Sequence, residues 1–149
     1  MSVDPYKAGM LTKSPYTVKE AVLAKVVAVL DFASDQRGLQ LIQQPSRAVK
    51  EGEVHELIVT MDKNAAPASK VNQVAYLAFV AINNSGVILR NDQVTCNGNV
   101  IGTIAGFDET HMPNHQNIVI FGTSDATGHE LGFKIGDIFT FSMDKETKK

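Results

Sequence analysis

The stretch "VKEGEVHEL", residues 49–57, joins a turn signal to an apolar strand, and two stretches of the same kind follow it. "ILRNDQVTC" begins at Ile88 and "FKIGDIFTF" begins at Phe133. In each, a residue that tolerates the left-handed backbone conformation precedes an acid that can accept hydrogen bonds from free backbone N–H groups. The turn residues are Gly52, Asn91 and Gly136, and the acids are Glu53, Asp92 and Asp137. Three similar entries into strands predict a small barrel with pseudo-repeated strand units.

Other short apolar segments continue this pattern along the chain. Their β-branched or alternating composition favours strands, although the longest of them, residues 71–82, is also long enough for a helix. The expected fold is therefore all-β, a small closed or partly open barrel with at most one or two short helices. We expect an N-terminal arm at residues 1–16, one barrel domain at 17–143 and a disordered tail at 144–149.

Local signals add detail to this expectation. Thr17 and Glu20 have the spacing of a capping box, which predicts at most one helical turn before a strand. The sequences "NNSG" at 83–86 and Asn-Gly at 97–98 predict hairpin turns. Residues 129–133 predict a short extended segment.

Composition narrows the class of protein. The chain has 149 residues, 44% of them hydrophobic, and a net charge of −2, so it can bury a core but carries no basic stripe for nucleic acid. Its longest apolar run, residues 74–82, is too short to cross a bilayer, and we expect a cytoplasmic protein with no membrane partner. Cys96 is the only cysteine, which excludes an internal disulfide and favours a buried thiol over a nucleophile.

The loop "FDETHMPNHQN", residues 107–117, holds the densest group of titratable side chains. His111 and His115 have the spacing of a helical metal chelate, but Pro113 between them predicts a turn. A turn can still bring both imidazoles to one divalent metal ion, with Asp108 or Glu109 adding a carboxylate oxygen.

His55 is the third candidate, because strand alternation places it with Leu57 and Val59 on the more apolar face of its strand. It is either a core histidine with a hydrogen-bond partner or part of an internal site. We expect the loop that holds His111 and His115, the strand with His55 and the turn with His129 to meet at one barrel mouth, where they would suit proton transfer or metal binding. The alternative interpretation is a set of separate core and solvated histidines.

Two longer segments resemble known families. "RGLQLIQQPSRAVKEGEVHELIVT" and "GTIAGFDETHMPNHQNIVIFG" are similar to a small bacterial family known only as a domain of unknown function, a resemblance that covers most of residues 22–143 and implies a compact β-barrel. Residues 102–120 and "ELGFKIGD" also resemble the sorbitol-specific sugar-phosphotransferase component, a small β-barrel with a phosphorylated histidine. No histidine of this chain can be matched to that phosphorylation site.

Three functional hypotheses follow. The first is a barrel that binds a divalent metal or a small polar ligand at the histidine and acid cluster, with lyase, isomerase or hydrolase chemistry left open. The second is a non-catalytic subunit that forms a homo-oligomer or pairs with a larger enzyme. The third is a histidine phosphocarrier, which only the second resemblance supports. Candidate residues for catalysis are His111, His115 and His55, and candidate metal ligands are His111, His115, Asp108, Glu109 and His55.

Overall fold

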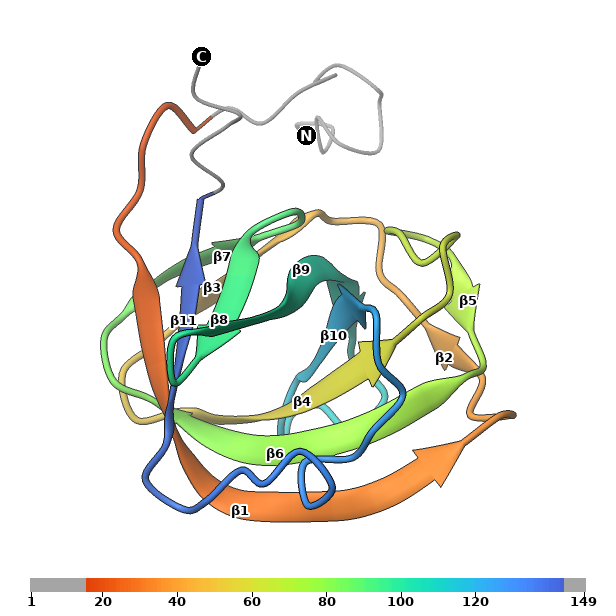
Figure 1. The fold of residues 1–149 in the computed structure, drawn as a ribbon. Helices are drawn as coiled ribbons and strands as arrows, with labels where there is room; N and C mark the ends of the chain where they lie inside the picture. Colours follow the sequence, from red (N-terminus) through yellow and green to blue (C-terminus); the bar gives the residue numbers. More distant parts are fainter. Residues whose placement is uncertain (1–15, 144–149) are drawn as a thin grey trace, which may run out of the picture.

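The computed structural model describes residues 16–143, which form eleven β-strands and no helix. The all-β prediction is therefore confirmed, while the predicted arm at 1–16, apart from Tyr16, and the tail at 144–149 lie outside the described residues. Seven strands close a barrel in the order β1-β11-β8-β9-β10-β4-β6 (Figure 1). They are β1 (Val22–Ser34), β11 (Ile138–Ser142), β8 (Gln93–Cys96), β9 (Asn99–Asp108), β10 (Asn117–Gly122), β4 (Val54–Thr60) and β6 (Val74–Ile82).

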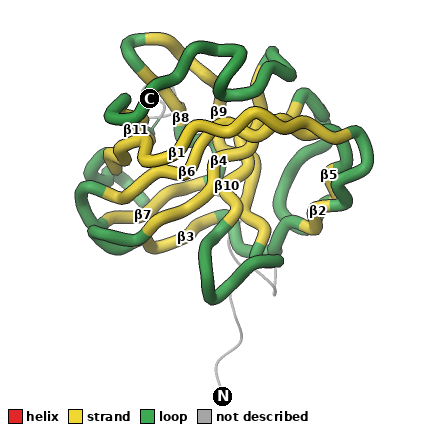
Figure 2. The backbone as a smooth tube through the Cα atoms, turned by 90° about the horizontal axis from the view of Figure 1, so that it is seen from below, coloured by secondary structure: helices red, strands yellow, loops and turns green. Residues whose placement is uncertain are grey.

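Two short strand pairs lie beside the barrel. They are β2 (Leu39–Gln40) with β5 (Lys70–Val71), and β3 (Ser46–Val49) with β7 (Gly86–Leu89). Figure 2 shows the β2–β5 pair at one side, away from the barrel strands, and β3 next to β7 at the other. Within the barrel, β10 and β4 are parallel, and the other neighbours are antiparallel.

Strand β4 is buried on both of its faces. Leu57 and Val59 point into the barrel core, as the alternation predicts, together with Phe107 and Phe139. Ile58 points outward into a second apolar cluster that also contains Leu39, Leu41, Val71, Val74 and Tyr76. The segments around β2 and β5 thus cover part of the outer face of β4 and β6. Polar side chains next to this covered area are partly shielded from water.

The three sequence repeats form three equivalent turns. Gly52, Asn91 and Gly136 all have positive φ, at 91°, 74° and 98°. The carboxylate that follows each of them accepts a hydrogen bond from the backbone N–H three residues earlier, on Lys50, Leu89 and Lys134, at 2.8 to 2.9 Å. Each turn also exchanges two backbone hydrogen bonds with one residue of a barrel strand, namely Ile82, Ile104 and Val26. The predicted entries into strands are confirmed, and each docks against the barrel in the same way.

Other local predictions meet mixed outcomes. Asn97 and Gly98 both have positive φ and join β8 to β9, so this hairpin is confirmed. The hairpin at 83–86 is wrong, because β7 pairs with β3 and β6 pairs with β1 and β4. No helical turn forms at residues 17–21, which lead directly into β1.

Residues 128–132 form a turn, where the sequence predicted an extended segment at 129–133. A reciprocal cap explains the difference: the backbone N–H of Thr127 donates to Glu130 Oε1 at 2.8 Å, and that of Glu130 donates to Thr127 Oγ1 at 3.2 Å.

Candidate functional site

The β9–β10 loop forms a turn at residues 110–114, as Pro113 predicts, and the Met112–Pro113 peptide bond is cis. The turn brings the imidazole rings of His111 and His115 together, with centroids 5.0 Å apart and planes 31° from parallel. His111 is exposed and His115 is buried. His111 therefore stacks on His115 from the solvent side.

His115 packs on the outer face of β4 and β6. Its ring meets Phe79 edge-on at 5.0 Å, and its Nε2 atom lies 3.7 Å from Oε1 of Glu56. Glu56 and Phe79 are direct partners in the β4–β6 register, so both side chains leave the sheet on one face. The other ring nitrogen, Nδ1, is 3.0 Å from the Asn114 amide nitrogen, which donates to it. The neutral ring then carries its proton on Nε2, and this N–H points toward the carboxylate.

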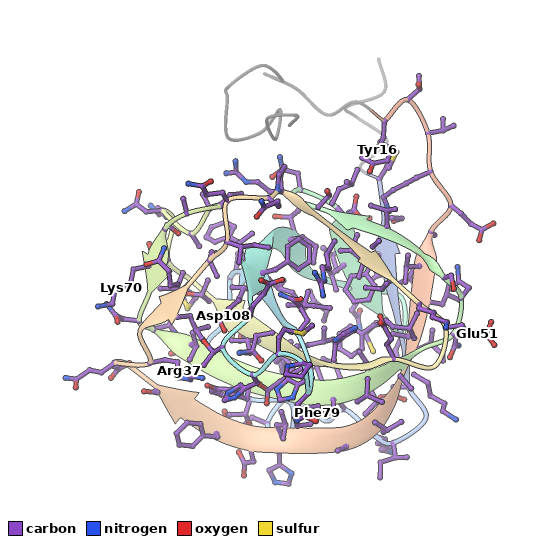
Figure 3. All side chains as sticks on the ribbon, turned by 180° about the vertical axis from the view of Figure 1, so that it is seen from behind. Tyr16, Arg37, Glu51, Lys70, Phe79 and Asp108 are labelled. Atoms are coloured by element: carbon purple, nitrogen blue, oxygen red, sulfur yellow. The ribbon has the colours of Figure 1, made fainter. Side chains whose placement is uncertain are left out.

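Arg37 borders the cluster on its other side. Its Nε donates to the Tyr76 hydroxyl at 2.5 Å, and its Nη2 donates to Nε2 of His111 at 3.3 Å. Tyr76 in turn lies 5.3 Å, between ring centroids, from the exposed ring of Phe32. A continuous series of contacts thus runs from an exposed aromatic ring through Arg37 to the two histidines. Arg37 and Phe79, which border the two histidines, are labelled in the lower half of Figure 3.

Burial brings the pKa values of Glu56 and His115 closer together. Desolvation raises the pKa of Glu56 above 4.5, and the charge of Arg37 only partly opposes it. Desolvation also lowers the pKa of His115 below 6.5, and the charges of His111 and His55 act in the same direction, while the side chain of Asn117 opposes the shift. The shift of Glu56 is toward neutral pH, the range in which a general acid or base works best.

Several buried polar atoms beside His115 have no hydrogen-bond partner in the described part of the chain. They are His115 Nε2, Asn117 Oδ1 and Gln116 Oε1, and the residues Asn117 and Gln116 are fully buried. Buried polar groups of this kind are normally satisfied, so these atoms are the ones beside His115 that could still form a hydrogen bond with a further polar partner.

Asp108 and Glu109 are both engaged in contacts within the protein. The buried Asp108 carboxylate accepts hydrogen bonds from the Gln40 and Thr110 backbone N–H groups and the Asn117 amide, which makes it a structural brace for the loop. Glu109 forms a 3.1 Å ion pair with Arg47 at the surface.

His55 faces the barrel interior, and both of its nitrogens are engaged. Its Nδ1 accepts a hydrogen bond from the Gln116 backbone N–H at 2.9 Å, and its Nε2 lies 3.1 Å from Glu53 Oε1. His55 therefore supports the loop from behind and presents no free nitrogen to a ligand.

His129 is exposed, and its backbone N–H donates to Leu30 of β1. Among residues 16–143, no hydrogen bond, ion pair or ring contact joins it to the other histidines. The structure brings His111 and His115 together, with His55 behind their loop, but the expected meeting of all four histidines is not seen.

No group of three or more His, Cys, Asp or Glu side chains in the described residues is placed to hold a metal ion. The divalent metal site stays a prediction. In the same part of the chain, no helix is long and apolar enough to cross a membrane.

Comparison with known proteins identifies one family. A family of unknown function (DUF6917) matches residues 16–142, which is most of the chain. The chain belongs to this family. The match confirms the first resemblance found in the sequence and adds no activity. The second resemblance, to the sorbitol-specific component, is not shown and stays a prediction. No curated protein and no solved structure matches the chain.

Three residues around His115 were not expected from the sequence, namely Glu56, Arg37 and Asn117. Glu56 could have been found from the alternation in "VHELIVTM", because a glutamate on a strand with two largely apolar faces is a candidate buried carboxylate. Arg37 follows β1 and carries no local signal.

Proposed function

We propose that this family member binds a small polar ligand on the outer face of β4 and β6, through His115 and Glu56. The observation that carries the proposal is the Nε2 atom of His115, which is buried, has no hydrogen-bond partner in the described residues and lies 3.7 Å from a buried carboxylate. Together the two groups offer a donor and an acceptor to a ligand hydroxyl, amide or carbonyl group. His111 is then a movable cover, since it is exposed and stacks over His115.

The charges around the cluster favour a small molecule over a metal ion. The lone pair on Nε2 of His111 already accepts a hydrogen bond from Arg37, whose positive charge repels a cation. His115 and Glu56 would remain as two protein ligands, fewer than the three or four of most zinc sites.

The proposal is tested by the ring signals of the four histidines in NMR spectra. Glycerol, acetamide and glycolate are added separately, and zinc chloride is added in a parallel titration. We expect at least one organic probe to shift the signals of His111 and His115 in a saturable way. The exposed His129 is the internal reference, because it lies outside the cluster.

Two variants sharpen this test. His115→Gln removes the unpartnered imidazole nitrogen and is expected to abolish binding, while His129→Gln is expected to leave it unchanged. If no organic probe moves the His115 signals, or if His129 responds equally, the proposal is wrong. Stoichiometric zinc binding that shifts both His111 and His115 would favour the metal hypothesis in its place.

A further inference from the structure

Arg37 has hydrogen-bonding capacity beyond its contacts within the cluster. A guanidinium carries five N–H donors, and in the described residues Arg37 uses one on the Tyr76 hydroxyl and one on His111. The side chain is only partly buried. The two Nη atoms therefore retain N–H groups that can form the fork that binds a carboxylate through two parallel hydrogen bonds.

We propose that the ligand is a small organic acid whose carboxylate binds Arg37 and whose hydroxyl or carbonyl oxygen reaches Nε2 of His115. This inference rests on the proposed function and names the chemical class of its ligand. Arg37 and His115 both contact the His111 ring, Arg37 at its Nε2 atom and His115 against its ring face, so a short molecule that takes the place of His111 would lie beside both.

The carboxylate itself supplies the reason for His111 to move. The hydrogen bond from Arg37 Nη2 to His111 Nε2 is 3.3 Å long and joins a cation to a neutral ring. An anionic carboxylate is a stronger acceptor for the same donor, because it adds the attraction between two opposite charges and can accept two parallel hydrogen bonds from the guanidinium. Binding at Arg37 thus releases the cover over His115.

A carboxylate fits this environment better than a phosphate. Arg37 acts on Glu56 electrostatically, so the Glu56 carboxylate is close enough to repel a second anion. A phosphate monoester carries about 1.5 to 2 negative charges at neutral pH, and this repulsion grows with the charge of the ligand. The exposed ring of Phe32, next to Tyr76, offers an apolar wall for the carbon part of an organic acid.

The test compares three probes by isothermal titration calorimetry: glycolate, the neutral analogue ethylene glycol, and inorganic phosphate. We expect glycolate to bind the wild-type protein about tenfold or more tightly than ethylene glycol, which is the effect of one charge-assisted hydrogen bond. We also expect glycolate to bind more tightly than phosphate. These comparisons on the wild-type protein need no variant to fold.

The binding of glycolate is also expected to strengthen as the pH falls through the folded-state pKa of Glu56, which burial raises above 4.5. Protonation of Glu56, whose pKa is raised by burial, removes the repulsion between the two carboxylates. Protonation of His115, whose pKa burial lowers below 6.5, acts in the same direction. The charged and titratable groups beside the ligand are Arg37, Tyr76, Glu56, His111 and His115, while His55 and Asp108 hold the loop in place.

Arg37→Gln is expected to weaken glycolate binding about tenfold or more and to leave ethylene glycol binding unchanged. Arg90→Gln is the matched control, because Arg90 is exposed in the second repeated turn. The proposal of an organic acid ligand would be wrong if glycolate and ethylene glycol bound with equal affinity, or if Arg37→Gln bound glycolate as tightly as the wild type. In either case ethylene glycol would still shift the His115 signals, which separates this failure from failure of the site itself. Tighter binding of phosphate than of glycolate would also contradict the proposal of an organic acid ligand.

Discussion

The backbone N–H of Gln116 donates a 2.9 Å hydrogen bond to Nδ1 of His55, and this bond ties the β9–β10 loop to the barrel interior. Because Nδ1 accepts, the neutral ring carries its proton on Nε2 and donates it to Glu53 in the first repeated turn. One buried imidazole thus joins two segments that lie far apart in the sequence, and the position of His115 depends on it.

The first prediction concerns this link. His55→Leu leaves the buried Gln116 N–H without an acceptor and is expected to lower the free energy of unfolding by about 1–3 kcal/mol. Urea unfolding followed by circular dichroism measures the loss. His129→Leu, at an exposed position, is expected to change stability by less than about 0.5 kcal/mol. Equal effects of the two variants would contradict the bridging role of His55.

The second prediction concerns Glu56. Its folded-state pKa is raised above the ordinary 4.5, so the protonated form favours folding. The stability that protonated Glu56 contributes is fully present below pH 4.5, and it is lost as the pH rises through the folded-state pKa of Glu56. Glu56→Gln should therefore gain stability relative to the wild type as the pH rises from about 4 to 8. Urea unfolding across that range tests it, with the exposed Glu51→Gln as control. A difference between the curves that stays constant with pH would refute the burial argument.

The third prediction concerns the two stacked histidines. His111 lowers the pKa of His115 through its charge and through the burial to which its stacked ring contributes. His111→Gln removes the charge and is expected to raise the pKa of His115 toward 6.5, as measured by NMR titration of the ring signals. Stability linked to His115 is present above pH 6.5 and is lost as the pH falls through its lower folded-state pKa, so this loss should shrink in the variant. An unchanged or lower pKa would show that His111 does not act on His115.

The fourth prediction concerns the buried ion pair between Lys19 and Asp92, with 2.8 Å between Nζ and Oδ2. Lys19→Met leaves the Asp92 carboxylate buried without its cation and is expected to cost about 3–5 kcal/mol. The double variant Lys19→Met, Asp92→Asn should recover part of this loss, because no uncompensated charge remains. Thermal and urea unfolding compare both with Lys25→Met at an exposed position of β1. A loss below about 1 kcal/mol for Lys19→Met would contradict the prediction.

The fifth prediction concerns the repeated turns. At Gly136, with a φ of 98°, an added Cβ meets no atom within 4 Å, so Gly136→Ala should cost about 1 kcal/mol for backbone strain alone. Gly136→Asn should cost less, since Asn91 holds the equivalent position with a φ of 74°. Gly128→Ala should cost about 3 kcal/mol or more, because its Cβ would lie 1.8 Å from the Leu77 carbonyl oxygen. We expect the loss in unfolding free energy to increase from Gly136→Asn through Gly136→Ala to Gly128→Ala. Equal losses in the three variants would contradict this prediction.

The candidate site was only partly predictable. The turn at Pro113 and the meeting of His111 with His115 follow from neighbouring residues, because a proline between two close positions restricts the backbone locally. Glu56 and Arg37 join the cluster from distant parts of the chain, through strand pairing and through the segment after β1. The alternation of residues 54–61 marks Glu56 as a candidate buried carboxylate, but no local pattern shows which side chains it meets.

The sequence by itself determined most of the barrel strands, the three turns with positive φ and the inward direction of His55. Each of these depends on steric limits and side-chain alternation within a few residues. Only the tertiary structure decided that β7 pairs with β3, that β2 and β5 cover one outer face, and that Glu56 is buried beside His115. Barrel closure decides these contacts, because it chooses which strands become neighbours and which faces lose their water.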